Sequence, residues 1–116
     1  MAASKNPRAR LLHIRDEIDG ATAAVAGVTF ESYRKNYLQR RAIERALQII
    51  SEAARALPPE LLDRHAGAPW AKIIALGNVL RHEYQQISDV QIWEVVTVHL
   101  PALRPVVLAM LDESGA

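Results

Sequence analysis

The stretch RRAIERALQIISEAARAL (residues 40–57) decides the fold class of this chain, because its apolar residues recur at steps of three and four. That spacing puts them on one face of an α-helix and the charged residues on the other. The apolar stripe consists of Ile43, Leu47, Ile50, Ala54 and Leu57. The opposite stripe consists of Arg41, Glu44, Arg45, Gln48, Glu52 and Arg55. It is either a solvated face or part of a site, and the residue types favour a solvated face.

The same periodicity predicts four main helices. The first runs from about Pro7 to Ala26, and the second is capped by Thr29 and runs to Leu57. A connector follows at residues 58–69, with room for one short helical turn. The third helix runs from about Pro69 to Gln86.

The fourth helix is capped by Ser88 or Asp89, and Pro101 and Pro105 are expected to interrupt or kink it. No strand pattern, repeat or second domain is evident in the sequence. We therefore expect an all-α fold, an antiparallel bundle of four to five helices. A single domain should span residues 1–116, with residues 1–7 as a flexible N-terminal tail.

Composition narrows the classes of function. Fourteen Lys and Arg against 13 Asp and Glu give a net charge of +1, so any binding of anions must be local. The chain has no cysteine, which excludes disulfides, thiolate metal sites and cysteine nucleophiles and fits a reducing compartment. The N-terminus lacks a signal-like apolar stretch, and Glu94, His99 and Arg104 break the longest apolar runs. We expect a cytoplasmic protein that does not enter the membrane.

Ordinary cofactor and metal sites find little support in the sequence. The four histidines (His13, His65, His82 and His99) are far apart and form no metal-ligand motif, and His65 is expected at the surface. No glycine-rich phosphate loop or nucleophile elbow is present, so we predict no cofactor and no metal. Trp70 and Trp93 are expected to be core or interface anchors.

The stretch GNVLRHEY (residues 77–84) carries the most chemistry. On a helix, Asn78, Arg81, His82 and Gln85 fall within about 120° of arc and form a polar ridge. Histidine moves protons near neutral pH, and a guanidinium binds phosphate while keeping its charge. An exposed helix face is the simpler interpretation of an adjacent Arg and His. The chemical interpretation is cleavage of RNA, with the 2′-hydroxyl as nucleophile, His82 moving a proton and Arg81 stabilising the phosphoryl charge.

Several stretches together resemble the HepT-like branch of the HEPN superfamily. They are residues 40–57, Trp70 with Ile73, residues 77–84, and IWEVVTVHLPAL at residues 92–103. The resemblance covers about residues 10–111. It implies a helical-bundle homodimer that acts as a metal-independent endoribonuclease toxin, with an MNT-type nucleotidyltransferase as its antitoxin.

The site pattern of that family maps onto this chain with one departure. The family has an arginine followed by a polar residue, then a histidine and, two positions later, a tyrosine. Asn78 matches the polar residue, His82 the histidine and Tyr84 the tyrosine, but the arginine position holds Gly77. Arg81, four positions after Gly77, is the candidate replacement. We therefore predict His82, Arg81 and Asn78 as catalytic residues.

Further expectations follow from this mapping. We expect Arg81 and Gln85 to contact the substrate and Tyr84 to be the position that the partner modifies with adenylate. Tyr84 could instead pack at an interface with only its hydroxyl exposed. Gly77 leaves two hypotheses open: an RNA-cleaving enzyme that uses Arg81, or a catalytically impaired dimer that binds RNA or a nucleotidyltransferase.

Overall fold

The computed structural model describes residues 6–82 and 88–115, and every regular element in these two ranges is helical. The elements are α1 (Pro7–Val25), α2 (Phe30–Lys35), α3 (Tyr37–Arg55), α4 (Pro59–Arg64), α5 (Trp70–His82), α6 (Asp89–Glu94), a π-helical segment (Val95–His99) and α7 (Leu100–Gly115). The predicted all-α bundle is confirmed. The predicted N-terminal tail lies outside the described residues apart from Asn6, which caps α1, and Pro7, which begins it.

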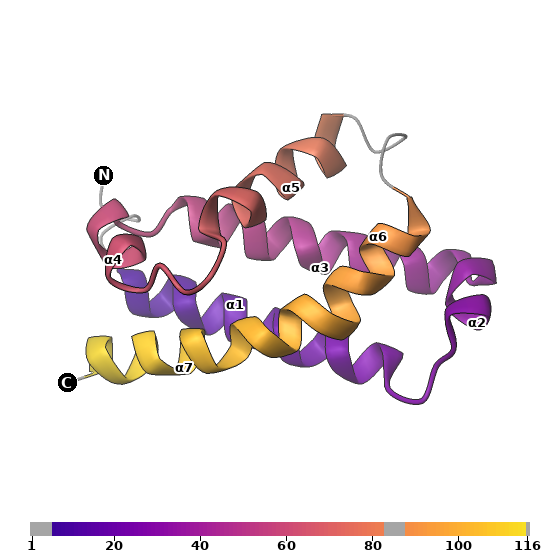
Figure 1. Cartoon of the computed structure of the whole chain (residues 1–116), viewed down its shortest axis with the longest axis horizontal. Coiled ribbons are helices and arrows are strands. Elements are labelled where there is room, and N and C mark those ends of the chain that lie inside the picture. Colours follow the sequence, from indigo (N-terminus) through magenta and orange to yellow (C-terminus); the bar gives the residue numbers. More distant parts are fainter. Residues whose placement is uncertain (1–5, 83–87, 116) are drawn as a thin grey trace.

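Three long helices, α1, α3 and α7, lie along one another, and α5 crosses α3 obliquely (Figure 1). The Gln39 side-chain amide donates to the Ala24 carbonyl at 2.9 Å, so the start of α3 meets the end of α1. Arg8, at the start of α1, donates to the carbonyl of Leu111 near the end of α7. Both pairs show that α1 runs antiparallel to its two long neighbours.

A bidentate ion pair between Arg104 and Asp19 joins the middle of α7 to α1. The Arg104 Nε atom lies 2.7 Å from Asp19 Oδ1, and Nη2 lies 3.3 Å from Oδ2. The hydrogen bond from Arg104 holds the pKa of the Asp19 carboxyl below its usual range. Arg104 was expected only to interrupt an apolar run. In the structure it also joins α7 to α1.

The single helix predicted over residues 29–57 is wrong, because Asn36 divides it into α2 and α3. Thr29 does cap the first piece, accepting from the Ser32 amide at 3.1 Å. Asn36 has non-helical angles (φ −100°, ψ 99°), and its side-chain oxygen accepts from the Gln39 amide at 2.9 Å. A short polar side chain can cap a new helix in this way, and hydrophobic periodicity does not register the break.

The last helical stretch continues through both prolines. Ser88 forms a capping box with Gln91, as its expected role as a cap requires. Leu100 donates its amide to Val95, five positions back, so the turn ahead of Pro101 widens into a π-helical segment. The expected interruption is therefore a local change of helical geometry, after which α7 runs on with Pro105 inside it.

By length and composition alone, the helix Asp89–Glu113 could cross a membrane, because an 18-residue window within it has a mean hydropathy of 1.5. The expectation that charged residues keep the apolar runs well short of a span is wrong for this helix. Packing within the bundle accounts for many of its apolar residues, because α7 and the π-helical segment pack against α1. Val96, Val107 and Met110 are fully buried there.

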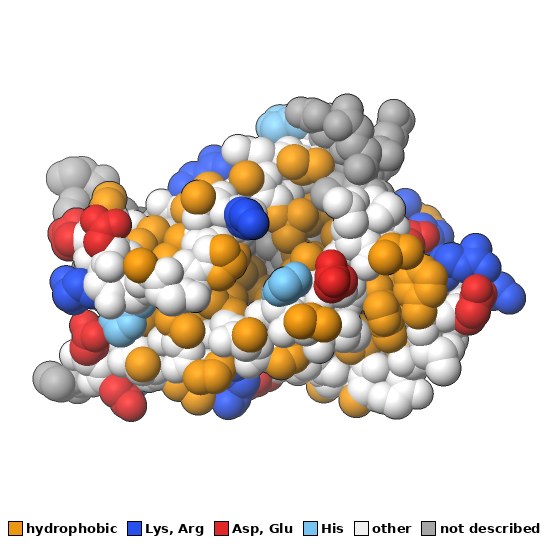
Figure 2. All heavy atoms as spheres, viewed as in Figure 1, with side chains coloured by type: hydrophobic (Ala, Val, Ile, Leu, Met, Phe, Trp, Pro, Cys, Tyr) orange, Lys and Arg blue, Asp and Glu red, His pale blue; other side chains and the backbone are white. Residues whose placement is uncertain are grey.

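An apolar groove separates α5 from the π-helical segment Val95–His99. Figure 2 shows apolar side chains gathered on this face, with a hollow between the two helices. The groove is lined by Pro69, Lys72, Ile73, Leu76, Val95 and His99. The hollow continues toward α7 along Leu103 and Val106. This face therefore exposes apolar surface that the bundle itself does not cover.

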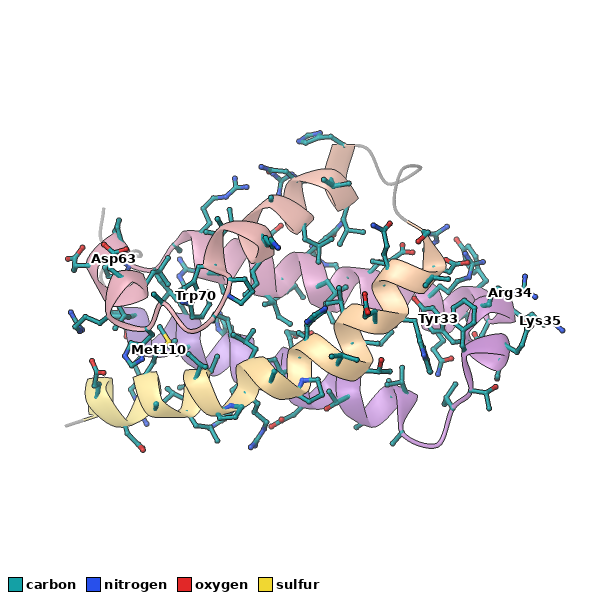
Figure 3. All side chains as sticks on the ribbon, viewed as in Figure 1. Tyr33, Arg34, Lys35, Asp63, Trp70 and Met110 are labelled. Atoms are coloured by element: carbon teal, nitrogen blue, oxygen red, sulfur yellow. The ribbon has the colours of Figure 1, made fainter. Side chains whose placement is uncertain are left out.

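The core has an aromatic cluster at one end and mainly aliphatic packing, with Trp70, toward the other. Tyr33 is fully buried and lies against Trp93, with ring centroids 5.2 Å apart, and Trp93 also meets Phe30 edge-on at 6.0 Å. Burial raises the pKa of the Tyr33 hydroxyl. Figure 3 shows Tyr33 at the α2 end and Trp70 and Met110 toward the other end. Both tryptophans are packing residues, as predicted.

Candidate active site

The end of α5 presents the polar ridge that the sequence predicted. Asn78, Arg81 and His82 are all exposed, whereas Gly77 and Leu80 face inward and are buried. The helical period thus sorts the cluster onto one side of α5. Tyr84 and Gln85, the other two predicted site residues, lie outside the described residues.

Arg81 contacts both of the other polar residues on the ridge. Its Nη2 atom donates to Asn78 Oδ1 at 2.7 Å, and its Nε atom donates to His82 Nε2 at 3.4 Å. The Arg81 side chain therefore links the imidazole of His82 to the amide of Asn78.

Helix α3 contributes a second arginine that the sequence analysis did not assign to the site. Arg55, the last residue of α3, donates from Nη2 to the same Asn78 Oδ1 atom at 2.6 Å. Its guanidinium therefore lies next to that of Arg81. The only sequence signal for it was its place in the polar stripe of α3, which was open to both interpretations.

Glu52, from the same stripe, also lies near the ridge. Glu52 Oε2 is 3.9 Å from Nη1 of Arg81 and 3.9 Å from Nη1 of Arg45. Arg45 also donates to Gln48 at 3.3 Å. Glu52 thus lies between the guanidinium groups of Arg45 and Arg81, while that of Arg55 meets Arg81 at Asn78. The stripe is largely exposed, as preferred from the residue types, but Glu52 and Arg55 also contact residues of α5.

Gly77 is the point at which α5 touches α3 most closely. A Cβ atom added at Gly77 would lie 2.0 Å from Ser51 Oγ and 2.4 Å from Ser51 Cβ. Ser51 is itself buried and donates to the Ile74 carbonyl at 2.9 Å, so it is held in place. A larger residue at position 77 would have to push the two helices apart. An arginine at this position does not fit the present packing.

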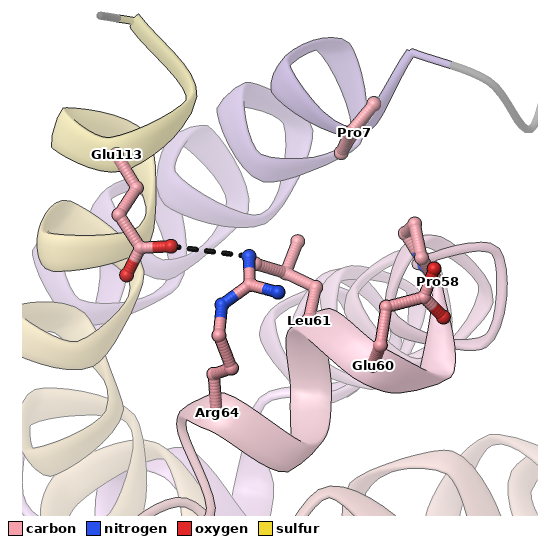
Figure 4. A pocket seen from close by; sticks show the side chains of 6 residues that line it. All are labelled: Pro7, Pro58, Glu60, Leu61, Arg64 and Glu113. Carbon is pink, nitrogen blue, oxygen red and sulfur yellow. Dashed lines mark hydrogen bonds and ion pairs between the residues drawn. The ribbon is translucent and has the colours of Figure 1, made fainter.

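A pocket lies beside α4, α7 and the start of α1, away from the ridge (Figure 4). Arg64 contacts Glu113 at 3.2 Å across it, and His65 Nε2 lies 2.6 Å from Glu113 Oε2. These two partners hold the pKa of the Glu113 carboxyl below its usual range. His65, expected at the surface, is partly buried there, with its side chain 14% exposed. No predicted site residue lines this pocket.

Metal ligands do not gather in the part of the chain that the structure describes. Within residues 6–82 and 88–115, no three His, Asp or Glu side chains are grouped so that they could hold a metal ion. The side chain that contacts His82 is instead Arg81, which also binds the amide of Asn78. Arginine side chains suit phosphate and carboxylate groups.

Comparison with known protein families identifies the family of this chain. The family described as Ribonuclease HepT-like matches residues 14–110, which is most of the chain. The chain belongs to the HepT-like ribonuclease family. The match includes both α3 and α5 and therefore every residue of the ridge.

Several relatives of this HepT-like chain are described as ribonucleases. A candidate RNase of Caldanaerobacter subterraneus subsp. tengcongensis is 35% identical over 94% of this chain and 97% of its own length. Another candidate RNase, from Methanocaldococcus jannaschii, is 25% identical over 88% of this chain and 94% of its own. A candidate ribonuclease HepT of Thermococcus cleftensis is 27% identical over 66% of this chain and 70% of its own. No solved structure matches this chain.

Replacing Gly77 by alanine should destabilise this HepT-like fold. The added Cβ overlaps Ser51, and overpacking of this kind costs about 1–3 kcal/mol, which exceeds the roughly 1 kcal/mol that alanine gains over glycine in a helix. Urea unfolding should show a lower midpoint for Gly77→Ala. The double variant Gly77→Ala with Ser51→Gly should recover part of the loss, since it removes the overlapping atoms.

Gly20 provides the matched control. It lies within α1, and a Cβ added there meets nothing within 4 Å. Gly20→Ala should therefore stabilise the fold by roughly 0.5–1 kcal/mol. If Gly77→Ala and Gly20→Ala shift the unfolding midpoint in the same direction, the close contact at Gly77 does not constrain α5.

Proposed function

We propose that this HepT-like protein is a metal-independent endoribonuclease and the toxin of a type II toxin–antitoxin system. The single observation that carries the proposal is the joining of His82 to Arg81 and Asn78 on the exposed end of α5. Family membership supports the reaction class, and the relatives described as candidate RNases support RNA as the substrate. The proposed location is the cytoplasm, without insertion into a membrane.

In the proposed mechanism, His82 accepts the proton of an RNA 2′-hydroxyl. The 2′-oxygen then forms a bond to the adjacent phosphorus while the bond to the 5′-oxygen breaks. The proton returns to the leaving 5′-oxygen, which gives a 2′,3′-cyclic phosphate and a 5′-hydroxyl. Arg81 stabilises the negative charge that grows on the phosphoryl oxygens. Before the strand binds, Asn78 holds Arg81 in place through a 2.7 Å hydrogen bond.

The packing of Gly77 favours a second candidate function. The family pattern has an arginine at this position, and Ser51 leaves no room for one here. If Arg81 does not replace that arginine, the site binds RNA or a nucleotidyltransferase without cleaving. In that case the protein is a dimeric binding module of the same fold.

We also propose a homodimer that buries the apolar groove between α5 and the opposite helix. The groove walls include Ile73, Leu76 and Val95, which are only partly covered within one chain. A surface of this kind is typical of an interface. The groove and His82 share α5, so a second copy bound there would lie close to the site.

Changing His82 to alanine should abolish cleavage. Proton transfer by a positioned side chain typically contributes about 10²–10⁴-fold to the rate. RNA cleavage by the purified protein in EDTA and growth arrest on expression should both be lost in this variant. His13→Ala is the control, because His13 is an exposed histidine on α1 outside the ridge, and it should leave both readouts unchanged. Toxicity of the His82 variant equal to that of the parent would refute catalysis.

Changing Leu76 to glutamate should dissociate the dimer. A charge placed in the apolar groove would be buried without a partner in the interface. Sedimentation equilibrium should give a dimer for the parent and a monomer for Leu76→Glu. Leu38→Glu is the matched control, since Leu38 is 76% exposed on α3 outside the groove. A dimer that survives in the Leu76 variant places the interface elsewhere.

The proposed antitoxin is an MNT-type nucleotidyltransferase that modifies Tyr84 with adenylate. The added phosphate would introduce negative charge two positions after His82 in the sequence and repel an RNA phosphate. Incubation with a cognate nucleotidyltransferase and ATP should add adenylate to Tyr84, detected by mass spectrometry of peptides. Tyr37, which is 59% exposed on α3, serves as the internal control and should stay unmodified. Equal labelling of both tyrosines would contradict a specific modification.

A further inference from the structure

Arg55 and Arg81 come from different helices and converge on one neutral oxygen. Their Nη2 atoms lie 2.6 Å and 2.7 Å from Asn78 Oδ1. Two positive groups repel each other at this range, and an amide oxygen carries only a partial charge to offset them. A more strongly charged acceptor at this place would be bound by both arginines at once.

The charges around this point are not balanced by nearby acids. The arginines in this region are Arg45, Arg55 and Arg81. Among the described residues, Glu52 is the carboxylate that contacts them, at 3.9 Å from Arg81 and from Arg45. Three arginines against one glutamate leave two positive charges in excess. The chain as a whole has a net charge of only +1, so this excess is local. A local excess of this kind attracts an anion.

The contact between Gly77 and Ser51 explains how Arg55 reaches Asn78. Without a Cβ at position 77, α5 lies against Ser51 of α3, one turn before Arg55. The arginine side chain at the end of α3 then extends across to the exposed face of α5. The same packing that excludes an arginine from position 77 brings Arg55 into the site.

We propose that Arg55 and Arg81 together bind the phosphate of the RNA strand that is presented to His82. The proposal rests on the ribonuclease function proposed above and adds Arg55 as a substrate-binding residue. A non-bridging phosphate oxygen takes the place that Asn78 Oδ1 holds between the two guanidinium groups. Bonds from arginine to phosphate are charge-assisted and about twice as strong as neutral ones, so the exchange favours the bound strand.

The experiment measures binding of a single-stranded 2′-O-methyl RNA, which has no 2′-hydroxyl to react. Fluorescence anisotropy at several salt concentrations gives the affinity and its salt dependence. Arg55→Ala should weaken binding about tenfold and lower the slope of log K against log salt by about 0.7, the value for one phosphate contact on a single strand. Arg55→Lys should keep the slope but recover only part of the affinity, because lysine keeps the charge without the forked geometry.

Two further variants separate substrate binding from a structural role. Arg55→Met keeps an apolar side chain for packing and serves if the alanine variant unfolds in urea earlier than the parent. If Arg55 only anchored Asn78, the effect of Arg55→Ala would vanish in an Asn78→Ala background. We expect the loss of affinity and slope to persist there. Arg34→Ala is the control, because Arg34 is exposed on α2 and paired with Glu31.

The outcomes distinguish this proposal from the ribonuclease function. An Arg55→Ala variant that binds with unchanged affinity and slope overturns the phosphate site, even if the parent cleaves RNA. A loss of binding that vanishes in the Asn78→Ala background overturns it too, as does a parent that does not bind the oligomer. If Arg55→Ala loses affinity and slope but the parent protein cleaves no RNA, the phosphate site is supported and catalysis is refuted.

Discussion

The close contact between Gly77 of α5 and Ser51 of α3 is the constraint on which the candidate site depends. A glycine here removes the atoms that would otherwise separate the helices, because even a Cβ would approach Ser51 Oγ to 2.0 Å. Ser51 is anchored by its hydrogen bond to the Ile74 carbonyl, so neither side can easily yield. The close approach of α5 to α3 at this point therefore requires the missing side chain.

This contact also restricts which positions near His82 can carry an arginine. The family pattern implies an arginine at position 77, and the packing excludes it here. Arg81 supplies one guanidinium from the next turn of α5, and Arg55 supplies another from α3. The two meet at Asn78, next to His82. The charge that family resemblance assigns to one residue is thus found on two residues of different helices.

Much of the fold followed from hydrophobic spacing, and the errors have physical causes. The α1 bounds, the cap at Thr29 and the capping role of Ser88 were predicted correctly. The break at Asn36 was missed because a capping side chain can divide a helix while the apolar period continues. The effect of Pro101 was overestimated, since the π-helical turn before it lets the chain remain helical.

The sequence by itself determined the helical class, the family and the polar ridge of Asn78, Arg81 and His82. Each of these depends on spacing along one helix or on the order of local motifs. Only the tertiary structure decided that Arg55 joins the ridge and that position 77 has no room for a side chain. Both facts depend on how closely two helices far apart in the chain approach each other. That distance is set by side-chain volumes at their crossing, which the periodicity of either helix alone does not encode.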